Sequence, residues 1–350
     1  MSVALENGAQ SPVDLDVLSA WLDTQGVGNG PITDVSVLSG GTQNVMLRFR
    51  KGDSIPELVL RHPPPHKRAN SDETMRREAR LLLALESTDV PIPHLIAACP
   101  SVNVLGSAFY VMQSVSGFAP TLGVPEPYAS NADWQRQMGL SMADAIAALG
   151  RVDHESVGLG DFGRAENWLE RQVERWRSHL SSYEGTPNYP GHGIEGVDAL
   201  GGWLDAHRPA EWRPGIIHGD FHFANVMFAY EMPAVAAMVD WELGTIGDPL
   251  LDLGHLLATF PATDGNAAGV GSGLPGLPSR AALIDRYADS SNRDITTMTW
   301  YQVLACYRLG IILEGTNARA FAGLAPRATG DQLHATTLAL FAQARDLAGV

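Results

Sequence analysis

Two hydrophobic patterns divide the chain. In the first third, short runs alternate apolar and polar residues, and because successive side chains of a strand point to opposite faces, this alternation indicates β-strands. These runs predict strands at residues 32–38, 45–50, 57–61 and 105–112. Apolar residues three or four positions apart indicate amphipathic helices instead. That spacing predicts helices at residues 14–24, 70–85, 134–149, 168–180, 197–207, 249–259, 279–288, 296–314 and 331–348.

Strands near the start followed by many helices favour an α+β fold. The chain has 350 residues, of which 45% are apolar, and this is enough for one large or two medium domains with buried cores. No internal repeat or coiled-coil heptad is visible in the sequence.

The formal net charge of −15 bears on the choice of partners. Because like charges repel, we expect neither nucleic acid nor an anionic membrane surface to bind. Residues 1–12 lack the basic start and the apolar core of a secretory leader, and we expect Cys99 and Cys306 to be reduced. These features favour a cytoplasmic protein.

A polar segment between two apolar runs carries the candidate chemistry. Within residues 216–228, Asp220 is followed five positions later by Asn225, and the next apolar run ends at Asp240. Phosphoryl transfer requires a carboxylate that orients and deprotonates the attacking hydroxyl, and oxygen ligands that hold magnesium on the nucleotide phosphates. The spacing predicts Asp220 as the catalytic base and Asn225 and Asp240 as magnesium ligands.

Two other interpretations of this segment are weaker. Asp220 and Asn225 would satisfy only local backbone groups if the segment were a pair of hairpin turns. His218 and His222, four residues apart, would face one zinc ion only on a helix. Gly219 lies between two strand-like runs, which disfavours a helix.

The motifs resemble those of a known family. His-Gly-Asp-x4-Asn at residues 218–225 and Asp-Trp-Glu at residues 240–242 resemble the aminoglycoside phosphotransferase and choline kinase families, relatives of the protein kinases. Val-Leu-Arg-x-Pro-Pro at residues 59–64 is similar to one branch, the phosphotransferase-like domain of acyl-CoA dehydrogenase family proteins. The resemblance extends from about residue 32 to residue 320.

The resemblance implies a two-lobed, protein-kinase-like fold. Residues 1–114 would form a lobe with an antiparallel sheet and one helix, and residues 115–350 a larger helical lobe with the catalytic loop and the acceptor site. The implied cofactors are ATP, with GTP as an alternative donor, and Mg²⁺. The implied substrate is a small molecule with a hydroxyl group.

The resemblance also assigns a nucleotide site between the lobes. Its implied residues are Gly40, Gly41, Thr42, Asn44, Arg61, Glu78, Met112, Gln113, Ser114 and Val115. Arg61 replaces the lysine that contacts the phosphates in protein kinases, and Glu78 is the expected partner of Arg61. Glu73 is assigned to a capping box with Asn70 at the start of its helix.

Some assignments stay open. His222 either contacts the transferred phosphoryl group or packs locally, and Glu242 assists the metal or hydrogen-bonds the loop. By resemblance, Asp252 braces the catalytic loop. The acceptor is an aminoglycoside, an amino alcohol, a sugar, a hydroxy acid or its thioester, and the oligomeric state is undetermined. Because Arg61 replaces lysine, a nucleotide-binding regulatory protein without strong catalysis is the alternative function; a metal-dependent phosphatase is a weaker one.

Overall fold

A six-stranded antiparallel sheet forms the amino-terminal part of the computed structural model, which describes all residues except 1, 5–10, 39–43, 53–55, 65 and 262–272. The strand order is β1-β2-β3-β4-β6-β5, and each neighbouring pair is antiparallel. The strands are β1 (Ser2–Ala4), β2 (Ile32–Leu38), β3 (Val45–Lys51), β4 (Leu58–His62), β5 (Leu95–Cys99) and β6 (Phe109–Gln113).

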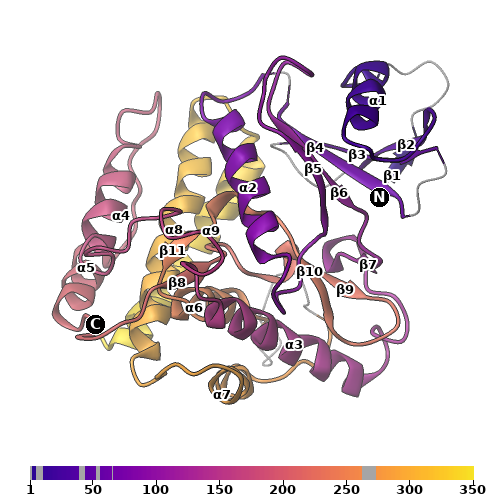
Figure 1. The fold of residues 1–350 in the computed structure, drawn as a ribbon. Coiled ribbons are helices and arrows are strands. Elements are labelled where there is room, and N and C mark those ends of the chain that lie inside the picture. Colours follow the sequence, from indigo (N-terminus) through magenta and orange to yellow (C-terminus); the bar gives the residue numbers. More distant parts are fainter. Residues whose placement is uncertain (1, 5–10, 39–43, 53–55, 65, 262–272) are drawn as a thin grey trace.

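The alternation of β4 determines where its only arginine points. Leu58 and Leu60 belong to the apolar core beneath α1 (Leu15–Thr24), on one face of the sheet. Val59 belongs to the larger core on the opposite face, which α2 (Ser71–Leu85) covers (Figure 1). Because side chains alternate along a strand, Arg61 shares the face of Val59. An arginine is thereby buried between the sheet and α2.

Helices form the second part of the molecule, so the predicted two-lobed α+β fold is confirmed. Figure 1 shows the two long helices α8 and α9 side by side, and α2 between the sheet and the helical part. The helices that follow the sheet are α3 (Ala132–Arg151), α4 (Gln172–Ser181), α5 (Val197–Ala206), α6 (Leu250–Thr259), α7 (Arg280–Ser290), α8 (Met298–Phe321) and α9 (Arg327–Ala348). The exact boundary between lobes at residue 114 stays a prediction.

Three details of the sequence interpretation were wrong. β1 and β5 were not predicted, and β6 begins at Phe109 because residues 102–107 form turns. The capping box is absent: Asn70 makes no side-chain capping hydrogen bond, and its backbone is not extended as that of a typical N-cap is. Glu73 instead pairs with Arg76 at 3.5 Å.

Two small sheets in the helical part bring distant segments together. β8 (Gly215–Ile217) pairs with β11 (Thr245–Gly247), and a second sheet has the order β10-β9-β7. Its strands are β7 (Gly117–Phe118), β9 (Val226–Ala229) and β10 (Val235–Met238). The polar segment predicted to carry the chemistry runs between β8 and β9. Among the described residues, no helix has the length and apolar character needed to cross a membrane.

We predict that Gly254→Ala destabilises the protein, because Gly254 allows α6 to approach α8. A Cβ atom at this position would lie 2.6 Å from the backbone oxygen of Tyr301. Forcing the helices apart should cost about 1–3 kcal/mol of unfolding free energy, measured by urea denaturation. Gly202→Ala on α5 is the matched control, since nothing lies within 4 Å of its added Cβ. The control should be neutral or stabilising, and equal losses in both variants would contradict the prediction.

Candidate active site

Backbone hydrogen bonds join the segments that carry Asp220, Asn225 and Asp240. The Val239 N–H donates to the Asn225 carbonyl at 2.9 Å, which ties the residue before Asp240 to the predicted catalytic loop, the segment between β8 and β9. The ring of His218 contacts the Val239 carbonyl at 2.9 Å through Nε2. The predicted site residues of both segments are therefore held together by the main chain.

Asp220 and Asn225 are in direct contact. The Asn225 side-chain amide donates to the Asp220 carbonyl at 2.9 Å and to its Oδ2 at 3.0 Å. With its nitrogen engaged in this way, Asn225 keeps its oxygen, Oδ1, as an available ligand for a cation.

Two imidazoles flank the same carboxylate. His255 Nε2 lies 3.2 Å from Asp220 Oδ1, and His222 Nε2 lies 3.5 Å from Asp220 Oδ2. Burial alone would raise the pKa of Asp220, but hydrogen bonding from His222 and His255 outweighs burial and lowers the pKa below its usual value. Burial lowers the pKa of His255, and the neighbouring Asp220 carboxylate opposes this change. Asp220 is thus an ionised carboxylate that can accept a hydrogen bond from a hydroxyl group.

Asp252 on α6 fixes the start of the catalytic loop. Its buried carboxylate accepts hydrogen bonds from the N–H groups of His218 at 2.7 Å and Gly219 at 2.8 Å. The predicted brace is confirmed. Gly219 has φ +82°, and a Cβ there would lie 2.6 Å from the Leu243 carbonyl oxygen, so only glycine fits this turn.

Arg61 links the sheet to the opposite side of the site. Its guanidinium donates to Glu78 Oε1 at 3.1 Å and to Asp240 Oδ1 at 2.7 Å, and Tyr110 donates to Glu78 Oε2 at 2.7 Å. Burial raises the pKa of Glu78, and the charge of Arg61 opposes this rise. Asp240 adopts a left-handed conformation with φ +66°. The predicted pairing of Arg61 with Glu78 is present, and Asp240 is a further partner.

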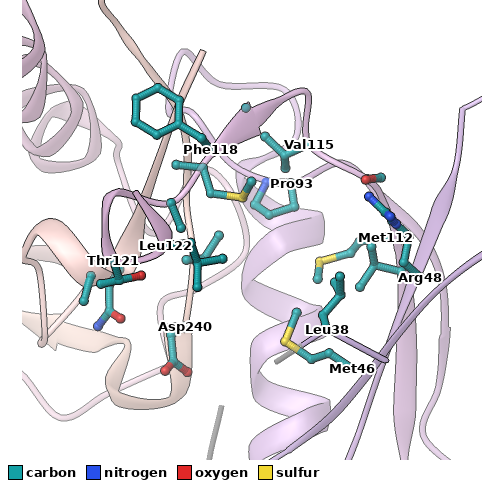
Figure 2. Close-up of a pocket in the computed structure, with 18 of the residues that line it drawn as sticks. Leu38, Met46, Arg48, Pro93, Met112, Val115, Phe118, Thr121, Leu122 and Asp240 are labelled. Carbon is teal, nitrogen blue, oxygen red and sulfur yellow. The ribbon is translucent and has the colours of Figure 1, made fainter. Parts of the chain in front are cut away.

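A cavity of about 760 Å³ lies beside these charged groups. Arg61, Asn225 and Asp240 line it together with four more of the predicted nucleotide-site residues, which are Met112, Gln113, Ser114 and Val115. Figure 2 shows Leu38 and Met46 on one side of the cavity and Thr121 and Leu122 on the other, with Asp240 at one end. An apolar slot that ends in charged groups suits a flat ring carrying a polar chain.

Other predicted residues lie outside the cavity lining. Asn44 and Asp220 are described but do not line the cavity, and Glu78 lies behind Arg61. Gly40, Gly41 and Thr42 fall outside the described residues.

Sequence reasoning missed two partners of the site, His255 and Tyr110. His255 lies three positions after Asp252, on the same face of α6, and that spacing was the available signal. For Tyr110 the sequence offered no specific signal, because it lies within a continuous buried run on β6.

Comparison with known proteins identifies the family. The sequence matches the phosphotransferase enzyme family over residues 34–288.

The chain belongs to this family.

The phosphotransferase domain also resembles parts of longer proteins. One relative is IBR3 of Arabidopsis thaliana, which is provisionally assigned as an acyl-CoA dehydrogenase. It is 31% identical to this chain, and the match covers 85% of this chain and 38% of IBR3. Acyl-CoA dehydrogenase family member 10 of Mus musculus is 28% identical over 82% of this chain and 28% of the mouse protein. The chain therefore spans well under half of the length of these relatives.

Solved structures share the fold. A Ralstonia eutropha protein, provisionally assigned as an aminoglycoside phosphotransferase, has a TM-score of 0.80 and 28% identity, covering 96% of this chain and 98% of that chain. Choline kinase from Cryptosporidium parvum has a TM-score of 0.62 and 10% identity, covering 95% of this chain and 96% of that chain. The second likeness concerns the fold alone.

We predict that Asp252→Ala loosens the catalytic loop of this phosphotransferase. Removing the carboxylate leaves two buried N–H groups without an acceptor, which should lower the unfolding free energy by about 3 kcal/mol. Urea denaturation measures this loss, and hydrogen exchange at His218 and Gly219 should accelerate. Asp252→Asn keeps one acceptor oxygen and should lose less. An Asn variant that loses as much as the Ala variant would contradict the assignment.

Proposed function

We propose that the protein is an ATP-dependent phosphotransferase that phosphorylates a hydroxyl group of a small molecule. The observation that carries the proposal is a chain of contacts between the predicted site residues. Asn225 hydrogen-bonds Asp220, and the residue before Asp240, Val239, hydrogen-bonds the Asn225 carbonyl. Arg61 in turn donates a hydrogen bond to Asp240. Arg61, Asn225 and Asp240 also line one cavity. Three parts that phosphoryl transfer requires thereby meet: a carboxylate for the acceptor hydroxyl, oxygen ligands for a metal ion and a phosphate-binding cation.

In this proposal the nucleotide occupies the cavity. The apolar side chains around Met112 take the purine, and the charged end takes the phosphates. Solved aminoglycoside phosphotransferases with this fold include complexes with ATP, GDP and ADP. We propose ATP as the donor and retain GTP as an alternative, since nothing in the lining distinguishes the two purines.

Each charged residue then has one task. Asp220 accepts a hydrogen bond from the acceptor hydroxyl and takes its proton, while Arg61 binds phosphate oxygens and Glu78 holds Arg61 in place. Because Arg61 engages Asp240 through Oδ1, the other oxygen of Asp240 is available.

The donor set fits magnesium. Asn225 Oδ1 and the Asp240 carboxylate are the hard oxygen ligands that Mg²⁺ prefers. When bound there, Mg²⁺ would neutralise charge on the transferred phosphoryl group and its leaving group.

We propose that the acceptor is a hydroxy acid or its thioester. The support is that sequence relatives are named as acyl-CoA dehydrogenase family members, although the chain spans only part of each. Measuring ADP release from MgATP against hydroxyacyl compounds, aminoglycosides, amino alcohols and sugars should give the highest kcat/KM with the first class. An aminoglycoside preferred over every hydroxyacyl compound would contradict this acceptor class.

We predict separate effects for the two aspartates. Asp220→Ala should reduce phosphate transfer by at least a thousandfold and leave the Kd for MgATP nearly unchanged, because Asp220 acts on the hydroxyl. Asp240→Ala should also weaken magnesium-dependent ATP binding at least tenfold, measured by isothermal titration.

Two outcomes would point to other functions. ATP binding by the natural protein without transfer to any acceptor would indicate a nucleotide-binding regulatory protein. Phosphate release from a phosphoester without ATP would indicate a phosphatase.

A further inference from the structure

The carboxylate of Asp220 is surrounded by donors that the catalytic motif does not include. His255 is fully buried on α6 and approaches Oδ1, while His222 and Asn225 approach Oδ2. The two imidazole rings are nearly parallel, 22° apart, with centroids separated by 5.8 Å, and each ring contacts a different oxygen of the carboxylate.

In each ring, the surroundings of Nδ1 indicate whether Nε2 carries a proton. His222 Nδ1 accepts a hydrogen bond from the Ala224 N–H at 3.1 Å, so a ring proton is on Nε2, which faces Asp220. His255 Nδ1 is buried without a hydrogen-bond partner in the described part of the chain. An unpaired buried acceptor costs less than an unpaired buried N–H, so the proton of His255 is also on Nε2.

The contact between His255 and Asp220 has hydrogen-bond length but imperfect alignment. Catalytic hydrogen bonds are often poorly aligned in enzymes without substrate and tighten in the reacting complex. A buried imidazole with no better partner for Nε2 among the described residues gains by completing this contact.

We propose that His255 and His222 are positioning residues that hold the Asp220 carboxylate with two imidazole N–H donors, one on each oxygen, and aim it at the acceptor hydroxyl. A carboxylate has about four lone-pair positions. His255 uses one on Oδ1, and His222 and Asn225 use two on Oδ2, so one position on Oδ1 remains for the hydroxyl. The inference rests on the proposed function for its catalytic consequence, but the contact itself can be tested separately.

A transition-metal site is the competing explanation of the same cluster. The ligand atoms of Asp220, His222 and His255 all lie within 4.8 Å of one another, and imidazoles with a carboxylate are ligands for such metals. A metal would require a bare Nε2 on His222. The Ala224 N–H occupies Nδ1 and keeps the proton on Nε2, which favours the donor role.

Long-range ¹H–¹⁵N NMR of the full chain with ¹⁵N-labelled histidine tests the contact. The His255 signals are assigned as those that disappear in the His255→Gln variant. The expected result is a neutral His255 protonated at Nε2, whose Nε2–H signal moves upfield in Asp220→Asn. A proton on Nδ1 of His255, or an Nε2–H signal that does not shift in Asp220→Asn, would overturn the proposal. His222 with a bare Nε2 would support the metal site and also overturn it.

The catalytic effect of the His255 contact is tested by steady-state kinetics, with MgATP as donor and water as acceptor. His255→Leu removes the donor and should lower kcat about tenfold or more, with KM for MgATP within twofold of the natural value, because orientation acts on the transition state. His255→Gln can supply an N–H near the Nε2 position and should retain kcat within threefold. Equal losses of kcat in the two variants would show a merely structural role.

His334→Leu is the matched control. His334 Nδ1 lies 2.7 Å from Oε2 of the buried Glu314, so this variant removes an equivalent imidazole–carboxylate contact remote in sequence from Asp220. It should lower the melting temperature without lowering kcat. If the natural protein transfers phosphate to neither water nor any acceptor, the proposed function fails, and the NMR experiment still decides whether the imidazoles hold Asp220.

Discussion

The guanidinium of Arg61 connects the sheet to the helical part of the molecule at the point where a nucleotide is proposed to bind. It pairs with Glu78, 17 positions later in the chain, and with Asp240, 179 positions later. Burying a charge is costly unless it is paired and hydrogen-bonded, and here the side chain of Arg61 is 7% exposed. The planar fork of arginine serves two carboxylates at once, whereas the compact ammonium of lysine lacks this geometry. The lysine of the protein kinases is thus replaced by a group suited to bridging.

Main-chain hydrogen bonds supply the rigidity of the site. Asp252 binds two successive N–H groups of the catalytic loop, and Val239 joins the Asn225 carbonyl to the segment before Asp240. These contacts hold the backbone of the segment that carries the functional groups, so these groups are preorganised. Helix α6 carries Asp252 and His255 on one face, so the element that braces the loop also contacts its carboxylate.

The two aspartates of the site meet different donors. Asp240 pairs with the permanently charged Arg61, whereas Asp220 lies among an amide and two imidazoles. A cation beside Asp240 suits a position where phosphate charge has to be balanced. The donors around Asp220 suit a carboxylate that has to be oriented toward an attacking hydroxyl. The environment thus distinguishes two side chains of the same chemical type.

The sequence by itself determined the fold class and most element positions, because periodicity and short motifs are local properties of the chain. It predicted roles for Asp220, Asn225 and Asp240 from their spacing, and for Arg61 and Glu78 through resemblance. It also indicated Asp252, through resemblance. Only the tertiary structure decided that Arg61 reaches Asp240 and that His255 approaches Asp220, since these contacts join residues far apart in the chain and depend on how helices pack against the sheet and the loop. The short strand β5 forms where it pairs with β6, a tertiary contact that outweighs a weak local preference.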